Sequence, residues 1–192
     1  MTKTISRREA GALALLTTLT GGAAIAQPRP YPAQSHAGMN HGAMNHGAMA
    51  LTAGDQRYVA DFMRIGGVGL RSSQLARSRS GSPLVRAFAE MEFREQTGLS
   101  QVLGDISGMR GPPPPDARFA AAEAQLQRAR GSEFDVLFGR GQIEAHEVAL
   151  RIQEDYLRGG RNQHLRHVAT LARGQILDHL TLLREGPRLM RS

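Results

Sequence analysis

A five-residue unit, Asn-His-Gly-Ala-Met, repeats near the N-terminus and brings imidazole and thioether side chains together at regular intervals. The six side chains concerned are His36, Met39, His41, Met44, His46 and Met49. Thioether sulfur favours Cu(I) and imidazole accepts Cu(II), so a flexible tract that carries both can hold copper in either oxidation state. The tract therefore predicts copper binding, with nickel and zinc as other candidate metals and a metal-free low-complexity spacer as the alternative.

Three further side chains, Glu95, His146 and His179, lie on or beside the inner stripes of three separate predicted helices. Polar groups at such positions are costly unless they are hydrogen-bonded or bind an ion. With the nearby Glu144, Glu147 and Asp178 they could at most form a mononuclear site suited to zinc, iron, manganese or copper. The chain has no Glu-x-x-His motif of the kind found in di-metal bundles. The alternative is that these groups hydrogen-bond one another and set the register of the helices.

Glu92 and Glu95 stand three residues apart on one predicted helix and could act as paired carboxylates. No nucleophile, Gly-rich phosphate loop or Ser-His-Asp arrangement accompanies them in the sequence, and Arg86 and Arg94 are near enough to pair with them. We therefore predict no catalytic residue, and a non-enzymatic binding protein is the first hypothesis.

Residues 1–26 have the composition of an export signal. A basic start with Arg7 and Arg8 precedes a short apolar run, and small residues at Ala24 and Ala26 fit signal peptidase. We expect cleavage before Gln27 and delivery to the periplasm by the twin-arginine or Sec route. The apolar run is too short for a lasting membrane span, so no stable span is expected after cleavage.

The chain has a formal charge of +7 and contains no cysteine. A disulfide framework, a thiolate nucleophile and a thiolate metal site are therefore excluded. After residue 26 every basic residue is an arginine, and these arginines are scattered over expected helix surfaces without interleaved aromatic residues. This distribution argues against nucleic acid as a partner, leaving a metal ion as the expected partner and no protein partner indicated.

Apolar periodicity predicts an all-α fold, with residues 27–53 as a disordered linker, 54–186 as a bundle and 187–192 as a tail. Helices are expected at 55–80, 83–107, 116–130, 132–158 and 162–185, the last ended by Gly186 and Pro187. The longest apolar stripe consists of Phe134, Leu137, Phe138, Gly141, Ala145, Val148, Ile152 and Tyr156. Because one helix cannot bury its own stripe, we expect an antiparallel four-helix bundle with one extra short helix.

Four segments of the expected bundle carry a family resemblance. They are AGDQRYVADFMRIGGVGLRSSQLA, SPLVRAFAEMEFREQTGLSQVL, GSEFDVLFGRGQIEAHEVAL and LRHVATLARGQILDHL. Together they resemble the exported ferritin-like family called domain of unknown function 4142, over nearly the whole expected bundle. The resemblance implies a ferritin-like helical bundle in the bacterial periplasm or envelope, and it implies no settled activity. Where family members commonly show an Asp-His pair in the second helix, this chain has Glu95 and Gln96.

Three functions follow from these patterns. The first is an exported, non-enzymatic protein that captures copper through its Met/His tract. The second is a ferritin-like metal-dependent oxidoreductase or storage bundle whose ligands are Glu95, His146 and His179. The third is an envelope-stress or structural module that binds no metal.

Overall fold

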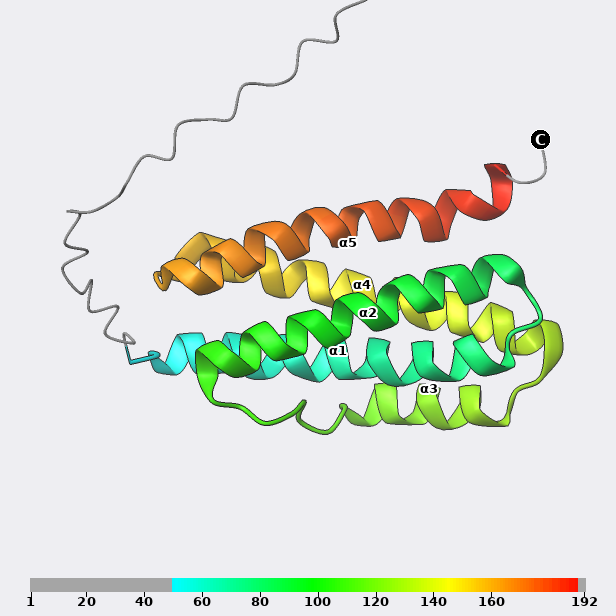
Figure 1. Ribbon diagram of the computed structural model, residues 1–192, viewed down its shortest axis with the longest axis horizontal. Coiled ribbons are helices and arrows are strands. Elements are labelled where there is room, and N and C mark those ends of the chain that lie inside the picture. The colour runs from blue at the N-terminus through cyan, green and yellow to red at the C-terminus, as the bar shows by residue number, and fades with distance from the viewer. Residues whose placement is uncertain (1–49, 190–192) are drawn as a thin grey trace, which may run out of the picture. The chain divides into compact units, whose positions relative to one another are not determined.

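The computed structural model describes residues 50–189, which form five helices and contain no strand (Figure 1). The helices are α1 (Ala53–Arg79), α2 (Pro83–Ser107), α3 (Ala117–Arg128), α4 (Gly131–Gly159) and α5 (Gln163–Leu189). The all-α prediction is therefore confirmed for this part of the chain. The expected export signal and the Met/His tract lie outside the described residues. Within the described part, no helix is both long and apolar enough to cross a membrane.

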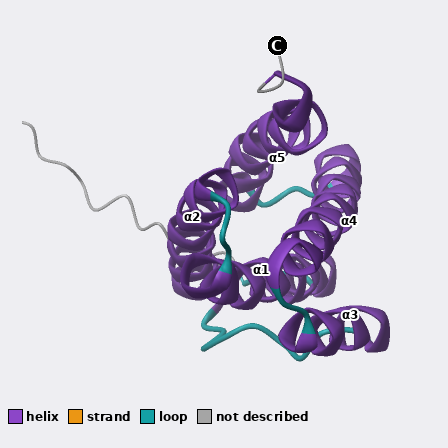
Figure 2. Ribbon diagram, turned by 90° about the vertical axis from the view of Figure 1, so that its right-hand side faces the viewer, coloured by secondary structure: helices purple, strands orange, loops and turns teal. Residues whose placement is uncertain are grey.

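Helices α1, α2, α4 and α5 surround a common interior, and α3 lies against the outside of the bundle (Figure 2). Helix α1 packs along α2 and α4, and α4 packs along α5, whereas α3 contacts α1 and α4. Short loops join α1 to α2 and α4 to α5, so each of these pairs is a helical hairpin. Between the hairpins, α3 carries the chain back along the bundle, so that α2 and α4 run in the same direction (Figure 1).

Local signals explain where the first two helices begin. The Asp55 backbone N–H donates to Thr52 Oγ1 at 3.1 Å, and the Thr52 backbone N–H donates to the Asp55 carboxylate at 3.0 Å, which forms a capping box. This box lies partly in the segment assigned to the linker, and α1 therefore begins at Ala53, two residues earlier than expected. Ser82 caps α2 ahead of Pro83, as the sequence predicts.

Helix α5 continues beyond the residues expected to end it. The sequence predicts a stop at Gly186 and Pro187, but the helix runs to Leu189. A proline lacks the N–H that would bond to the carbonyl four residues earlier, and in the last turn of a helix this removes a single backbone bond. The remaining two residues can therefore keep helical geometry.

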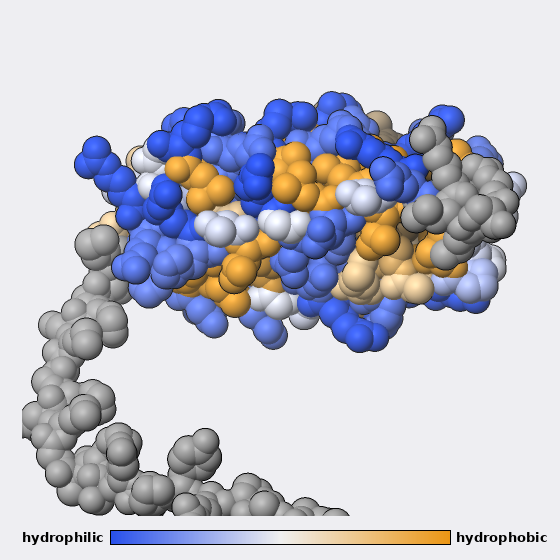
Figure 3. Space-filling model, turned by 90° about the horizontal axis from the view of Figure 1, so that it is seen from above, coloured by the Kyte–Doolittle hydropathy of each residue, from blue (hydrophilic) through white to orange (hydrophobic). Residues whose placement is uncertain are grey.

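The buried apolar side chains form two clusters. The first cluster joins mainly α1, α4 and α5 around Phe62 and Leu165, and the second joins mainly α2, α3 and α4 around Phe88 and Phe134. On the face of the bundle seen in Figure 3, apolar side chains form patches between polar ones. The bundle interior also holds polar side chains, among them Ser73, Glu92, Gln142, His146, Gln153 and His179.

The inner face of α4 is more polar than its sequence stripe predicts. Gln142, His146 and Gln153 are buried, whereas Leu137 and Val148 of the predicted stripe are only half-buried. The buried groups find hydrogen-bond partners inside the bundle, which removes the usual cost of burying them. A pattern based on hydropathy cannot register those partners, so the predicted stripe is displaced around the helix from the face that is buried.

Two stacked tyrosines join α1 to α4 near the start of α1. The rings of Tyr58 and Tyr156 lie 4.0 Å apart between centroids. The Tyr58 hydroxyl donates to Gln153 Oε1 at 2.7 Å, and the Tyr156 hydroxyl donates to Asp55 Oδ1 at 2.5 Å. Burial raises the pKa of both phenols, so both remain neutral hydrogen-bond donors. These bonds help to set the register of α4 against α1.

Two glycines on α1 allow α2 to approach closely. A β-carbon at Gly69 would lie 2.7 Å from Glu92 Oε1, and a β-carbon at Gly66 would lie 2.6 Å from Gln96 Oε1. Both distances are too short for a real contact, so any larger residue would displace these polar side chains. The glycines of α1 therefore provide the space that the polar residues of α2 occupy.

We predict opposite effects for two glycine-to-alanine substitutions. Gly69→Ala should destabilise the protein, because its contact with Glu92 outweighs the roughly 1 kcal/mol that alanine normally contributes inside a helix. Gly139→Ala, where nothing lies within 4 Å of the added carbon, should instead stabilise the protein by roughly 0.5–1 kcal/mol. Urea unfolding of both variants measures the difference. Equal stabilisation by both would contradict the close approach of α1 and α2.

Candidate metal centre

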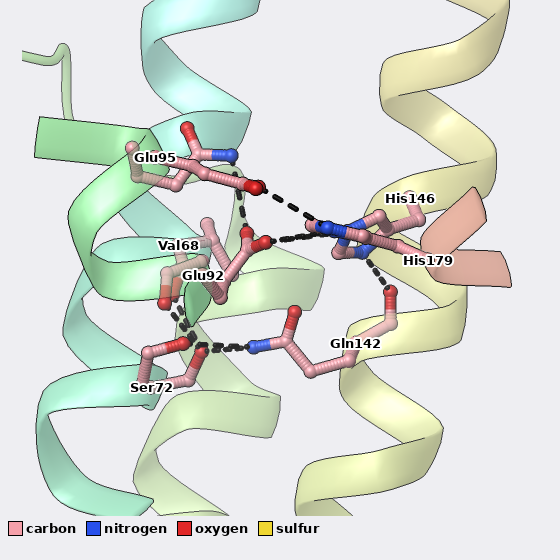
Figure 4. A network of polar contacts seen from close by, with 10 residues as sticks. Val68, Ser72, Glu92, Glu95, Gln142, His146 and His179 are labelled. Atoms are coloured by element: carbon pink, nitrogen blue, oxygen red, sulfur yellow. Dashed lines mark hydrogen bonds and ion pairs between the residues drawn. The ribbon is translucent and has the colours of Figure 1, made fainter. Parts of the chain in front are cut away.

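Three buried side chains from three helices meet inside the bundle: Glu92 from α2, His146 from α4 and His179 from α5 (Figure 4). His146 Nε2 lies 3.0 Å from His179 Nδ1. Glu92 Oε2 lies 3.2 Å from His179 Nδ1 and 3.4 Å from His146 Nε2. None of the three residues is more than 5% exposed. Two nitrogens and one carboxylate oxygen thus form a compact triangle, which we call the Glu-His-His cluster.

The other ring nitrogen of each histidine has its own partner. His146 Nδ1 donates to the backbone oxygen of Gln142 at 2.8 Å, and because a carbonyl only accepts, this contact assigns a proton to Nδ1. His179 Nε2 lies 3.2 Å from Glu95 Oε2, so its N–H donates to that carboxylate. Histidines that bind metals are held in this way, with the outer nitrogen bonded to a carbonyl or carboxylate. When both rings are neutral, each therefore presents a nitrogen lone pair toward Glu92.

Three acceptor atoms this close together require a positive charge between them. No described residue makes a well-formed hydrogen bond to Glu92 Oε2. A proton on one ring can bridge only two of the three atoms at a time, whereas a metal ion can satisfy all three. Ligands of a tetrahedral zinc ion lie about 2.0–2.1 Å from the metal, which puts them roughly 3.3 Å from one another. The separations of 3.0–3.4 Å in the cluster fit that spacing.

Glu92 is also held on its other oxygen. Gln96 Nε2 donates to Glu92 Oε1 at 3.1 Å, and the absence of a side chain at Gly69 leaves room for that oxygen. Burial alone would raise the pKa of Glu92, but the contacts with His146 and His179 outweigh burial and lower the pKa to about 2. Glu92 is therefore an ionised carboxylate at neutral pH.

The charges around His179 favour a cation. Burial alone would lower the pKa of His179, but Glu92, Glu95 and Asp178 outweigh burial and raise it above its ordinary value. Burial raises the pKa of Glu95. The positive charge of His179 lowers this pKa, and the negative charge of Glu92 raises it further. The histidines thus lie in a negative field in which a bound cation is stabilised.

A small cavity borders the cluster. It measures about 20 Å³, enough for one water molecule or ion, and all three cluster residues contribute to its wall. Phe62 and Ile176 supply part of its apolar lining. Phe88 packs edge-on against His179, with 5.4 Å between ring centroids. Apolar neighbours therefore form part of the wall around the cluster, and a small space remains beside it.

Gln142 links the neighbourhood of the cluster to α1 (Figure 4). Its Nε2 donates to Ser72 Oγ at 3.0 Å, and the Ser72 hydroxyl donates in turn to Val68 O at 2.8 Å. Because the Ser72 proton is already used, its oxygen can only accept, and this sets the orientation of the Gln142 amide. Gln142 Oε1 consequently points toward the cluster side, and no residue in the described part donates to it.

The structure brings His146 and His179 together as the sequence predicts, but Glu92 occupies the shared centre and Glu95 does not. Glu95 contacts only the outer nitrogen of His179 and is 25% exposed at its side chain. The sequence did contain a signal for Glu92, since this residue follows buried Phe88 by four positions on the same helix face. Both glutamates fall near the inner stripe, and periodicity alone does not distinguish them.

The carboxylates that neighbour the histidines in sequence do not join the cluster. Glu147 forms an ion pair with Arg184 at 2.6 Å, Glu144 pairs with Arg118 at 3.0 Å, and Asp178 is exposed. Successive residues of a helix point about 100° apart, so the neighbours of an inward-facing histidine face outward or sideways. The six predicted ligands of the Met/His tract lie outside the described residues.

We predict that the stability supplied by the cluster in metal-free protein falls at both low and high pH. The pKa of Glu92 is lowered from 4.5 to about 2, so its contribution is present above pH 4.5 and is lost as the pH falls toward 2. The pKa of His179 is raised from 6.5, so its contribution is complete below pH 6.5 and is lost as the pH rises through the raised value.

The difference in unfolding free energy between the wild type and Glu92→Gln should therefore be largest between pH 4.5 and 6.5. Urea unfolding with a chelator present, repeated across the pH range, measures this difference. A difference independent of pH would show that the cluster is not ionised as described.

Comparison with known proteins places the chain in a family. Searches of the curated proteins and of the solved structures found no match. A family model described as "Domain of unknown function (DUF4142)" matches residues 41–185. The match includes helices α1 to α4, most of α5 and every residue of the Glu-His-His cluster. The chain therefore belongs to the DUF4142 family.

Proposed function

We propose that this protein is a metal-binding helical bundle in which Glu92, His146 and His179 hold one transition-metal ion. The observation that carries the proposal is the convergence of three buried acceptor atoms, 3.0–3.4 Å apart. The ionised carboxylate offsets half of the charge of a divalent cation, the two neutral imidazoles supply lone pairs, and burying the carboxylate without a cation is costly. The outer hydrogen bonds of both histidines already hold the rings in the orientation that a metal requires.

The ligand types narrow the choice of metal. Imidazole and carboxylate ligands suit iron, manganese, zinc and copper, whereas magnesium and calcium prefer oxygen ligands alone. Two histidines and one carboxylate with further positions open are typical of mononuclear non-haem iron sites, and zinc accepts the same ligands. Such an ion supplies Lewis-acid or one-electron chemistry. A single-ion site supports a redox or binding role for the bundle better than bulk metal storage.

We further propose that the bundle is a ferritin-like antiparallel four-helix bundle. Its four long helices form two hairpins joined by one long crossover that contains α3, and ferritin-like folds have one such crossover. Ligands drawn from facing helices are also usual in that fold. The absence of Glu-x-x-His from the sequence supports one ion instead of two.

A second proposal concerns copper and the compartment. We propose that the export signal in residues 1–26 delivers the protein to the periplasm, where the Met/His tract binds copper independently of the bundle. The alternating imidazole and thioether side chains of the repeat support this role. The tract contains sulfur ligands suited to Cu(I), and the Glu-His-His cluster contains none, so the two sites should differ in metal preference.

We predict that the protein binds about one equivalent of zinc at the cluster. Glu92→Gln and His146→Ala should each weaken this binding by at least about tenfold, and Glu95→Gln, which removes the partner of an outer nitrogen, by roughly tenfold. Isothermal titration with a chain lacking residues 27–49 removes any contribution from the tract. His164→Ala, a change at an exposed histidine of α5, is the control and should leave affinity unchanged.

Circular dichroism of each variant confirms that loss of binding is not loss of folding. Unchanged zinc stoichiometry and affinity in both Glu92→Gln and His146→Ala would show that the Glu-His-His cluster is not the zinc site.

For the tract, we predict that deletion of residues 27–49 abolishes tight Cu(I) binding and leaves zinc binding at the cluster intact. This deletion retains Thr52, whose capping bonds begin α1, so the bundle should keep its stability. Competition with a Cu(I) chelator measures the affinity of both chains. Equal Cu(I) affinity with and without residues 27–49 would show that the tract is a spacer.

A further inference from the structure

We propose that the cavity beside the Glu-His-His cluster is the binding site for a neutral ligand of one or two heavy atoms, such as dioxygen, on the bound metal. This inference rests on the metal site proposed above and adds the class of ligand that the metal takes. Three features of the cavity carry it: its contact with the metal ligands, its size and the character of its walls.

The cavity and the metal ligands adjoin one another. Glu92, His146 and His179 all line the cavity, so a molecule inside it contacts the cluster directly. With three protein ligands, a transition metal retains at least one open coordination position. The cavity is the space beside the cluster into which such a position can face.

The volume of the cavity limits the size of its occupant. About 20 Å³ is enough for a water molecule, so a ligand that fits wholly inside the cavity is limited to about one or two heavy atoms. Ala145, Ala149 and Ala172 form part of the wall, and a larger side chain at any of these positions would reduce the space. The alanines of α4 and α5 therefore define a small-ligand pocket.

The walls select against charge. Phe62, Ile65, Leu99 and Ile176 make much of the lining apolar, which favours a ligand with little hydration to lose. The two acidic residues in the lining, Glu92 and Glu95, repel anions. A neutral diatomic molecule meets both conditions better than an anion does.

The cavity has a route to solvent between α2 and α5. Helices α1 and α2, α1 and α4, and α4 and α5 pack closely, whereas α2 and α5 approach less closely and are joined by contacts of His179 with Phe88, Glu92 and Glu95. Glu95, Gln96 and Leu99 on the α2 side of the cavity are half-buried, and Gln175 on the α5 side is exposed. A small molecule can therefore reach the metal past Leu99 and Gln175.

The test uses the full chain loaded anaerobically with Fe²⁺ and titrated with nitric oxide, a neutral diatomic probe whose iron adduct absorbs visible light. The wild type should form the adduct. Absorption that remains in His146→Ala comes from iron bound elsewhere and is subtracted. Ala172→Leu should retain iron but bind nitric oxide at least about tenfold more weakly, because the added atoms occupy the cavity. Ala129→Leu, a buried alanine outside the cavity, is the matched control and should bind nitric oxide normally.

A second variant, Leu99→Ala, enlarges the cavity instead of filling it. This test does not depend on the folding of Ala172→Leu. In Co²⁺-loaded protein, the wild type should exclude imidazole, a neutral ligand of five heavy atoms, and Leu99→Ala should admit it with a change in visible absorption. Nitric oxide binding that is equal in the wild type and iron-loaded Ala172→Leu would overturn the proposal. Imidazole binding that is equal in the wild type and Leu99→Ala would overturn it as well.

The two proposals fail in different ways. If no His146-dependent iron or cobalt binds, the metal site itself is wrong and the ligand pocket falls with it. If metal binds through the cluster but the cavity variants leave ligand binding unchanged, the metal site stands and the pocket alone is wrong.

Discussion

The contact among Glu92, His146 and His179 is the constraint on which the rest of the interior depends. A buried, ionised carboxylate is tolerated only when positive charge or hydrogen bonds surround it, and here the partners come from two other helices. The residues around the Glu92 carboxylate help to meet this requirement. Gly69 leaves room for the carboxylate, and Gln96 binds its second oxygen. Polar groups of three helices thus meet where a helical bundle normally buries only apolar side chains.

The same contact joins the two halves of the bundle. Helices α2 and α5 approach each other less closely than the other neighbouring pairs, and contacts of His179 with Phe88, Glu92 and Glu95 connect them across that side. A metal at the cluster would strengthen the connection, and binding free energy would then add to folding free energy. Apolar residues such as Phe88 and Ile176 shield the cluster from water, which strengthens its electrostatic interactions.

Sequence periodicity places His146 and His179 near the bundle interior, and it does not distinguish Glu92 from Glu95. Each of these two histidines lies on or beside the predicted inner stripe of its helix. Glu92 and Glu95 both fall on the predicted inner stripe of their helix, because a shift of three positions moves a side chain by only about 60° around the axis. Gln142 was not recognised as a buried polar residue, because its partners on α1 are distant in the sequence.

The sequence by itself determined the elements: five helices, the start of α2 at Pro83, and the family. These depend on local propensity, capping and the spacing of residues close together in the chain. The tertiary structure alone decided which glutamate meets the histidines, which face of α4 is buried and where a cavity remains. Those features depend on how far each helix is rotated and shifted against its neighbours, and the packing of residues distant in sequence sets both quantities.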